Sequence, residues 1–256
     1  MTAHRASPLH VGYYPSVITS ADILARVLYR DALMLVLDKP AGIPVHAGPK
    51  GGPNMEHYFD ALRFGLPRLP ALAHRLDRDT SGCLVLGRHR KALAKLGRLF
   101  AAGRIEKTYW AIVEGGPRED EGRIDLPLRK RSLDKRSWRM ETHPDGQAAI
   151  TDWRVLARGN GQAWLALHPR TGRTHQIRVH CAAAGFPLVG DPVYGHASAD
   201  SRVLLHARAI SVPLYANRDP IVVEAPPPAD FAAALKAMGA EVPASRVAPQ
   251  NASGAS

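Results

Sequence analysis

Two carboxylates are the first candidates for chemistry in this sequence. Asp77 and Asp79 lie in the polar stretch His74-Arg-Leu-Asp-Arg-Asp-Thr-Ser-Gly82, after two prolines and before an apolar run. A loop held by rigid elements can present such side chains to a substrate. The guanidinium groups of Arg75 and Arg78 favour an ionised carboxylate, which can act as nucleophile or general base. A solvated loop of alternating charges is the ordinary interpretation of the same residues.

The elements that must hold this loop follow from apolar periodicity. We expect a helix from Ser20 through Leu28 and others at 55–64, 89–102, 174–184 and beyond the prolines at 226–228. Apolar runs and alternation predict strands at 33–37, 83–87, 108–113, 149–157, 162–168, 203–214 and 220–224. Gly159-Asn-Gly161 is a hairpin turn, and the basic stretch 122–149 is expected to form a long hairpin or arm. This strand-rich pattern favours an α+β fold.

Composition narrows the class of protein. With 256 residues and 45% hydrophobic content, one compact catalytic domain is expected. The net charge of +11 favours a polyanionic partner, and no apolar run approaches the roughly 20 residues that span a bilayer. Cys83 and Cys181 lack the spacing of a zinc or disulfide framework and fit a reducing cytoplasm. The absence of a Gly-rich phosphate loop removes the main support for ATP binding.

The stretch from His74 to Gly82 resembles the catalytic signature of the RluA-type pseudouridine synthases, which is HRLD, two variable residues, then TSG. Three further stretches resemble the same family in the same order. They are Asp38-Lys-Pro-Ala-Gly-Ile-Pro-Val-His46, Glu106-Lys-Thr-Tyr-Trp-Ala111, and Thr171-Gly-Arg-Thr-His-Gln-Ile-Arg-Val-His180 followed by Gly190-Asp-Pro-Val-Tyr-Gly195. The resemblance covers roughly residues 30 to 215. No S4-like RNA-binding module precedes it, so a compact member of the family is expected.

The resemblance implies an α+β fold with a long, bent, mainly antiparallel mixed sheet, flanking helices and a central catalytic cleft. We expect a lead-in at 1–30, the catalytic domain at 31–228, and a C-terminal helix with a disordered tail at 229–256. By the same resemblance, Asp77 acts on uridine and the base reattaches through C5. Whether Asp77 attacks C1′ or removes a sugar proton stays open. Such an isomerisation requires no cofactor and no metal.

Two further residues receive catalytic roles from the resemblance. Arg178 is expected to pair with Asp77 in a bidentate geometry and keep it charged, with Arg173 as the second candidate for that pairing. Tyr109 is expected to stack on the target base from its strand. A surface cation and a core tyrosine are the ordinary interpretations of the two positions.

The remaining candidates concern RNA binding. A uridine in folded RNA must be extruded before its sugar is reached, and Arg75 is expected to fill the gap. Lys107, Arg173 and Leu205 are expected at the substrate, although a leucine on a strand is ordinarily core. The basic arm, with Trp138 among its charges, is expected to grip the RNA backbone, and a solvated arm without a partner is its competitor. Its candidate residues are Arg129, Lys130, Arg131, Lys135 and Arg136.

Several residues of the chain also allow other interpretations. His168, His175 and His180 suggest a metal site, but the five-residue offset of the last two favours hydrogen bonds within the fold. A catalytically inactive RNA-binding module and a glycosidase that pairs Asp77 with Asp79 are the alternative functions. The expected enzyme is a cytoplasmic monomer without membrane contact, acting on transfer RNA, large-subunit ribosomal RNA or both. The sequence does not choose between these substrates.

Overall fold

The computed structural model describes residues 18–48, 51–134, 138–197 and 201–243. It contains the helices α1 (Ser20–Ala25), α2 (Arg90–Ala101), α3 (Gln176–Ala183) and α4 (Ala229–Ala237), with a 3-10 turn at Met55–Tyr58. The strands are β1 (Val27–Arg30), β2 (Met34–Lys39), β3 (Ala71–Leu72), β4 (Ser81–Gly87), β5 (Glu106–Glu114), β6 (Glu121–Asp125), β7 (Leu128–Ser132), β8 (Trp138–Thr142), β9 (Ile150–Gly159), β10 (Gln162–Pro169), β11 (Leu205–Val212) and β12 (Ile221–Glu224).

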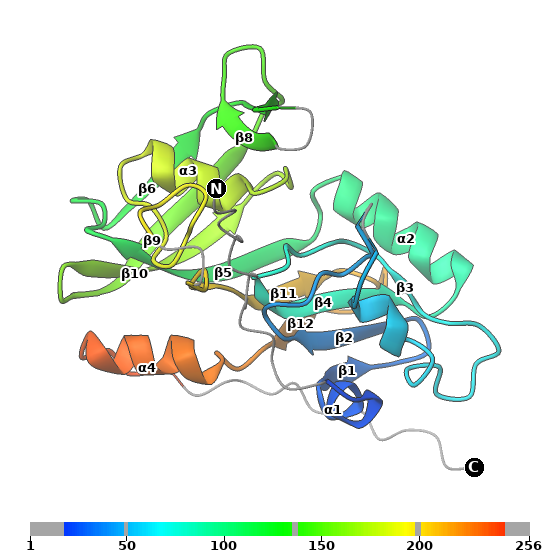
Figure 1. Ribbon diagram of the computed structural model, residues 1–256. Coiled ribbons are helices and arrows are strands. Elements are labelled where there is room, and N and C mark those ends of the chain that lie inside the picture. Colours follow the sequence, from blue (N-terminus) through cyan, green and yellow to red (C-terminus); the bar gives the residue numbers. More distant parts are fainter. Residues whose placement is uncertain (1–17, 49–50, 135–137, 198–200, 244–256) are drawn as a thin grey trace, which may run out of the picture.

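One large mixed sheet runs through the molecule (Figure 1). Its strand order is β1-β2-β4-β11-β5-β10-β9-β6, and β3 and β12 pair with β4 and β11. Among the described strands, β4 and β11 pair in parallel and all other pairs of the sheet are antiparallel. The predicted α+β class with a mainly antiparallel sheet is therefore confirmed. None of the described helices is long and apolar enough to cross a membrane.

Side-chain alternation along β5 and β10 gives the sheet two buried faces. On one face, Ala111 and Leu165 pack with Ile177 and Cys181 of α3. On the other, Ile112, Trp110 and Trp164 pack with Phe231 and Leu235 of α4. Figure 1 accordingly shows α3 and α4 on opposite sides of these strands. The site-bearing helix α3 is thus held by the centre of the sheet.

The predicted N-terminal helix is shorter than its periodicity indicated. Thr19, rather than Ser20, caps it in a capping box with Asp22, and the helix ends at Ala25. Val27 and Leu28, expected on the helix, belong to β1, which pairs with β2. Because β-branched and aromatic residues favour a strand beside an available edge, tertiary pairing overrode the helical spacing.

The helix expected at 55–64 is also replaced. Asn54 caps a 3-10 turn at Met55–Tyr58, and the chain continues in further turns with i→i+3 hydrogen bonds. Phe64 and Gly65 then take positive φ values of 45° and 80°, which end any helical path. Met55, Phe59 and Leu62 still cover the sheet, so the apolar periodicity marked burial correctly and the element type wrongly.

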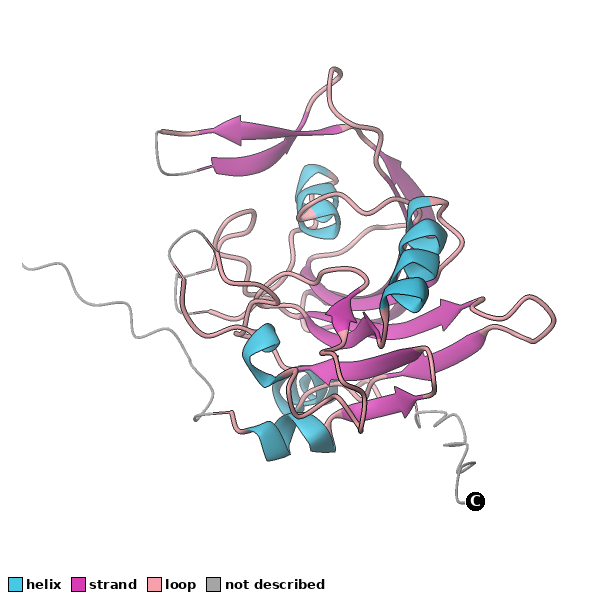
Figure 2. Ribbon diagram, turned by 90° about the vertical axis from the view of Figure 1, so that its right-hand side faces the viewer, coloured by secondary structure: helices cyan, strands magenta, loops and turns pink. Residues whose placement is uncertain are grey.

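A separate two-stranded hairpin, β7–β8, rises from the sheet beside α3 (Figure 2). It corresponds to the predicted basic arm. Register pairs Leu128 with Thr142, Lys130 with Met140 and Ser132 with Trp138, so these side chains share one face. Leu128 and Met140 pack with Val179 of α3, which makes this the inner face of the hairpin.

Candidate active site

The loop that carries Asp77 connects β3 to β4 and is tied to the sheet at both ends. At its start, the ring of His74 accepts a hydrogen bond from the Val85 amide at 2.9 Å and stacks on Phe100. Burial lowers the pKa of His74 to about 3, which keeps the ring a neutral acceptor. At its end, Ser81 pairs in parallel register with His206 of β11.

The loop leads into β4 at Gly82, a position that has no room for a side chain. Its φ is +103°, and a Cβ atom there would lie 2.2 Å from the carbonyl oxygen of Ala207. Only glycine lets β4 approach β11 this closely. The position of Asp77 relative to the central strands therefore depends on that contact.

The buried Lys39 clamps the loop from beneath. Its Nζ donates to the carbonyl oxygens of Pro40, Ile43 and Arg78 at 2.7, 2.8 and 3.0 Å. The Arg78 carbonyl also accepts from the Gly42 amide at 2.9 Å. Burial lowers the pKa of Lys39 to about 7, and the nearby Asp79 and Asp77 oppose that shift. The stretch from Asp38 to Gly42 thus holds the carboxylate loop in place.

Asp77 borders a cavity that opens to solvent. Seven of the predicted site residues line it together: Arg75, Asp77, Lys107, Tyr109, Arg173, Arg178 and Leu205. They come from four separate parts of the chain. Among the described residues, Asp79 is not part of this lining and pairs instead with Arg78 at 3.0 Å. A hydrolytic pair of Asp77 and Asp79 therefore has no support in the geometry.

Tyr109 forms part of the cavity wall from β5. Its neighbours across the sheet are Leu167 of β10 and Ala207 of β11. Burial raises the pKa of Tyr109, and the charge of Asp77 raises it further, so the phenol stays neutral. An uncharged aromatic ring half-buried beside a carboxylate is suited to contact a base.

Arg178 differs from the expected pairing. Its Nε and Nη2 donate to Asp191 at 2.7 and 2.8 Å in a buried bidentate pair. Burial opposes the charge on Asp191, but the hydrogen bonds and charge of Arg178 lower its pKa on balance. Asp77 lies close enough to act on Arg178 electrostatically. The predicted salt bridge to Asp77 was wrong because a closer, fully buried carboxylate takes the guanidinium fork.

Arg173, the second candidate for that pairing, is exposed, and its Nε donates to the carbonyl oxygen of Ala148 at 3.1 Å. Lys107 donates to the carbonyl oxygen of Thr171 at 3.1 Å, and burial lowers its pKa. Arg75 is exposed at the cavity, with no ion pair to any residue that the structure describes. Leu205 is buried in the core and lines the cavity as well.

His175 lies at the site, although the sequence predicted only a hydrogen bond within the fold for this residue. Its Nε2 lies 4.0 Å from Asp77 Oδ1, and its Nδ1 lies 2.8 Å from the hydroxyl of Tyr194. Its backbone is left-handed, with φ 52°, at the start of α3. Such strain in a non-glycine residue is found where a side chain must be aimed. The only sequence signal was its place in the Thr171–His180 stretch.

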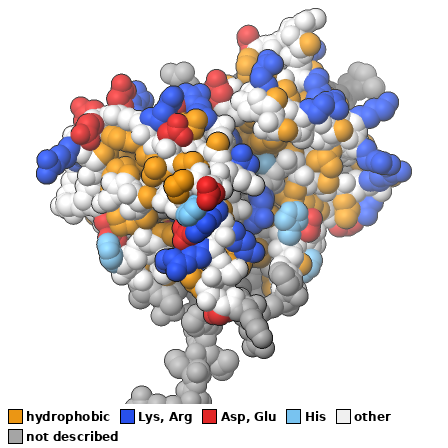
Figure 3. Space-filling model, turned by 90° about the horizontal axis from the view of Figure 1, so that it is seen from above, with side chains coloured by type: hydrophobic (Ala, Val, Ile, Leu, Met, Phe, Trp, Pro, Cys, Tyr) orange, Lys and Arg blue, Asp and Glu red, His pale blue; other side chains and the backbone are white. Residues whose placement is uncertain are grey.

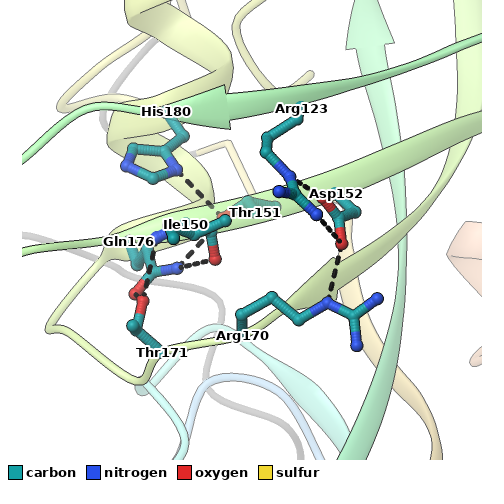
Figure 4. A network of polar contacts seen from close by, with 8 residues as sticks. All are labelled: Arg123, Ile150, Thr151, Asp152, Arg170, Thr171, Gln176 and His180. Atoms are coloured by element: carbon teal, nitrogen blue, oxygen red, sulfur yellow. Dashed lines mark hydrogen bonds and ion pairs between the residues drawn. The ribbon is translucent and has the colours of Figure 1, made fainter.

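The loop that delivers His175 is fixed by a polar network behind it (Figure 4). Buried Gln176 donates to the Ile150 carbonyl at 2.9 Å and to the Thr151 hydroxyl at 3.0 Å, while its oxygen accepts from Thr171 at 2.7 Å. His180 contacts Thr151 at 2.9 Å and the Leu126 carbonyl at 3.0 Å. The expectation that His175 and His180 hydrogen-bond within the fold is confirmed.

The hairpin carries the predicted arm residues on two faces. Arg129 and Arg131 lie on the outer face and both pair with Glu141, at 2.9 and 3.3 Å. Lys130 lies on the inner face, with its Nζ 4.7 Å from the centre of the Trp138 ring. Lys135 and Arg136 fall outside the described residues. Figure 3 shows Lys and Arg side chains spread over the face from which the hairpin rises.

Trp138 brings the hairpin to the cavity. Its ring stacks on His175 with centroids 5.6 Å apart and planes inclined by 20°. Trp138 is nevertheless 42% exposed. His175 thus lies between this solvent-exposed aromatic side chain and the Asp77 carboxylate.

Comparison with known proteins agrees with this geometry. The family model for RNA pseudouridylate synthase matches residues 33–183. An RNA pseudouridine synthase of Zymomonas mobilis is 46% identical over 209 residues, covering 80% of this chain and 95% of that protein. A ribosomal large subunit pseudouridine synthase C of Buchnera aphidicola is 34% identical, covering 83% of this chain and 70% of that protein.

Solved structures give the same result. Human RNA pseudouridylate synthase domain-containing protein 1 has a TM-score of 0.67 and 27% identity, covering 83% of this chain and 86% of that one. The domain-containing protein 4 shares the fold with a TM-score of 0.74, at 24% identity, covering 88% and 97%. The resemblance to the RluA type is confirmed. The chain belongs to the RNA pseudouridine synthases, the isomerases that convert uridine to pseudouridine in RNA.

Proposed function

We propose that this enzyme isomerises specific uridines in transfer RNA or large-subunit ribosomal RNA, with Asp77 as its catalytic carboxylate. One observation carries the proposal: Asp77, Tyr109, Arg178 and Leu205 line one cavity although they come from different parts of the chain. Asp77 would act on the ribose of a uridine that has left its stack. The reaction takes place where such RNA is found, in the cytoplasm.

The other lining residues have complementary tasks in this proposal. Tyr109 supplies the ring against which the detached uracil turns. Arg178, fixed by Asp191, adds positive potential near Asp77 without neutralising it through a direct bridge. Arg75, which is exposed at the cavity, enters the space that the flipped nucleotide vacates.

The test is release of tritium from RNA labelled at uridine C5. A new bond to C5 expels that hydrogen, whereas hydrolysis of the glycosidic bond releases uracil with its label intact. Transfer RNA and large-subunit ribosomal RNA transcripts are assayed separately. Release from one class identifies the substrate, and free uracil without tritium release would reject isomerisation.

Replacing Tyr109 by leucine is expected to lower turnover at saturating RNA while changing RNA affinity little. Stacking on a base contributes about 1–3 kcal/mol, which corresponds to roughly 5- to 150-fold in rate if it acts on the reacting state. Single-turnover rates and binding curves separate the two effects. Tyr58→Leu is the matched control, because Tyr58 packs partly buried against the same apolar cluster as Tyr109 but does not line the cavity. Normal turnover of Tyr109→Leu would remove the ring from the mechanism.

The hairpin cations are expected to bind RNA phosphates. Replacing Arg129, Lys130 and Arg131 by serine should lower the slope of log affinity against log salt by about 2, since each phosphate contact contributes roughly 0.7–0.9. The pairing with Glu141 keeps the loss below the full value for three contacts. The control replaces Arg90, Lys91 and Lys95 of α2 by serine, which removes the same charge away from the cavity. Equal slopes for both variants would show that the hairpin cations contribute to RNA binding only through the net charge of the protein.

A further inference from the structure

Tyr194 connects the hairpin to the active site through its hydroxyl group. The oxygen accepts a hydrogen bond from the main-chain amide of Met140 in β8 at 3.0 Å. The same oxygen lies 2.8 Å from Nδ1 of His175. The ring lies beneath the guanidinium of Arg178, whose Cζ is 5.1 Å from the ring centre. Tyr194 therefore joins the main chain of β8 to the His175 side chain at the start of α3.

The single proton of this hydroxyl has one acceptor among these contacts. The Met140 amide is a donor and cannot accept, so the Tyr194 proton points to Nδ1 of His175. Burial raises the pKa of Tyr194, which keeps that proton in place. Burial also lowers the pKa of His175, which favours the neutral ring. A neutral imidazole that accepts at Nδ1 carries its hydrogen on Nε2.

The position of Nε2 gives this tautomer a consequence. Nε2 lies 4.0 Å from Oδ1 of Asp77. With hydrogen on Nε2, an N–H dipole faces the carboxylate and stabilises its negative charge. With hydrogen on Nδ1, a nitrogen lone pair would face the carboxylate instead, which is repulsive.

We propose that Tyr194 is a positioning residue that holds His175 in its Nε2–H tautomer and thereby presents an N–H group to Asp77. The inference deepens the proposed function, since its kinetic effect rests on Asp77 being catalytic. The tautomer itself is independent of that role. The Trp138 ring stacks on the face of the His175 ring and restricts its rotation.

The first measurement is the tautomer of His175 in the folded protein, read from nitrogen-15 spectra of histidine-labelled enzyme. The signals of His175 among the 12 histidines are identified by their loss in His175→Gln. Protonated Nε2 and unprotonated Nδ1 are expected in the wild type. A protonated Nδ1 overturns the proposal at once, whether or not any RNA is turned over.

The second measurement uses Tyr194→Phe, which removes only the hydroxyl oxygen. We expect His175 to become a mixture of tautomers and kcat to fall on the order of tenfold, the scale for loss of an outer hydrogen-bond partner, with KM for RNA nearly unchanged. Tyr215→Phe is the matched control, because it removes a hydroxyl bonded to Asp31 at 2.8 Å outside the cavity. An unchanged tautomer, or a loss confined to KM, overturns the proposal. A wild type without turnover but with the expected tautomer would instead reject the proposed function.

Discussion

Asp77→Ala is expected to abolish pseudouridine formation, with a loss on the order of 10⁴-fold or more, while RNA affinity stays nearly unchanged. Removal of a residue that acts directly on the reacting bond has effects of this size. Affinity is retained because phosphate contacts dominate RNA binding and the substitution removes a negative charge. Tritium release from C5-labelled RNA and filter binding measure the two quantities on the same preparation.

Asp79→Ala is the matched control for this prediction. It removes the same group from the same loop, but Asp79 faces Arg78 rather than the cavity. Its turnover should stay close to that of the wild type. Comparable losses in both variants would indicate that the loop has been disturbed as a whole. Full activity of a correctly folded Asp77→Ala would exclude Asp77 from catalysis.

Asp191→Ala is expected to cost about 3–5 kcal/mol of the free energy of unfolding, the largest stability effect that we predict. The substitution leaves the buried guanidinium of Arg178 without its bidentate partner, and an unpaired buried charge carries a cost of this size. The Val193 and Tyr194 amides also lose the oxygen that accepts from them at 2.9 and 3.0 Å. Urea denaturation followed by circular dichroism measures the change.

Asp152→Ala supplies the comparison. Asp152 also has two arginine partners, Arg123 and Arg170, but their side chains are 60% and 61% exposed. Pairs in contact with solvent contribute about 0–1 kcal/mol. A similar loss of stability in the two variants would show that burial of the Arg178–Asp191 pair does not set its contribution.

Sequence and structure agree best where the signal is local. The apolar alternation of Thr108–Val113 and the turn at Gly159–Gly161 predicted β5, β9 and β10 within a few residues. Where a neighbouring strand competes, local spacing failed. Val27 and Leu28 fit a helix by periodicity, yet they belong to β1, which forms hydrogen bonds with the otherwise unpaired edge of β2. Edge availability is a property of the folded sheet and leaves no trace in the spacing of one segment.

The sequence by itself identified Asp77, Tyr109, Arg178 and four further residues among those that line the cavity. The resemblance of its four stretches to the family supplied Asp77, Tyr109 and Arg178, because each stretch carries its own residue types in a recognisable order. Only the tertiary structure decided how these residues are partnered. Asp191 rather than Asp77 takes the fork of Arg178, and Tyr194 reaches His175 and the Met140 amide. Spacing along the chain specifies residue types, whereas the choice among nearby carboxylates depends on distances of a few ångströms that only packing defines.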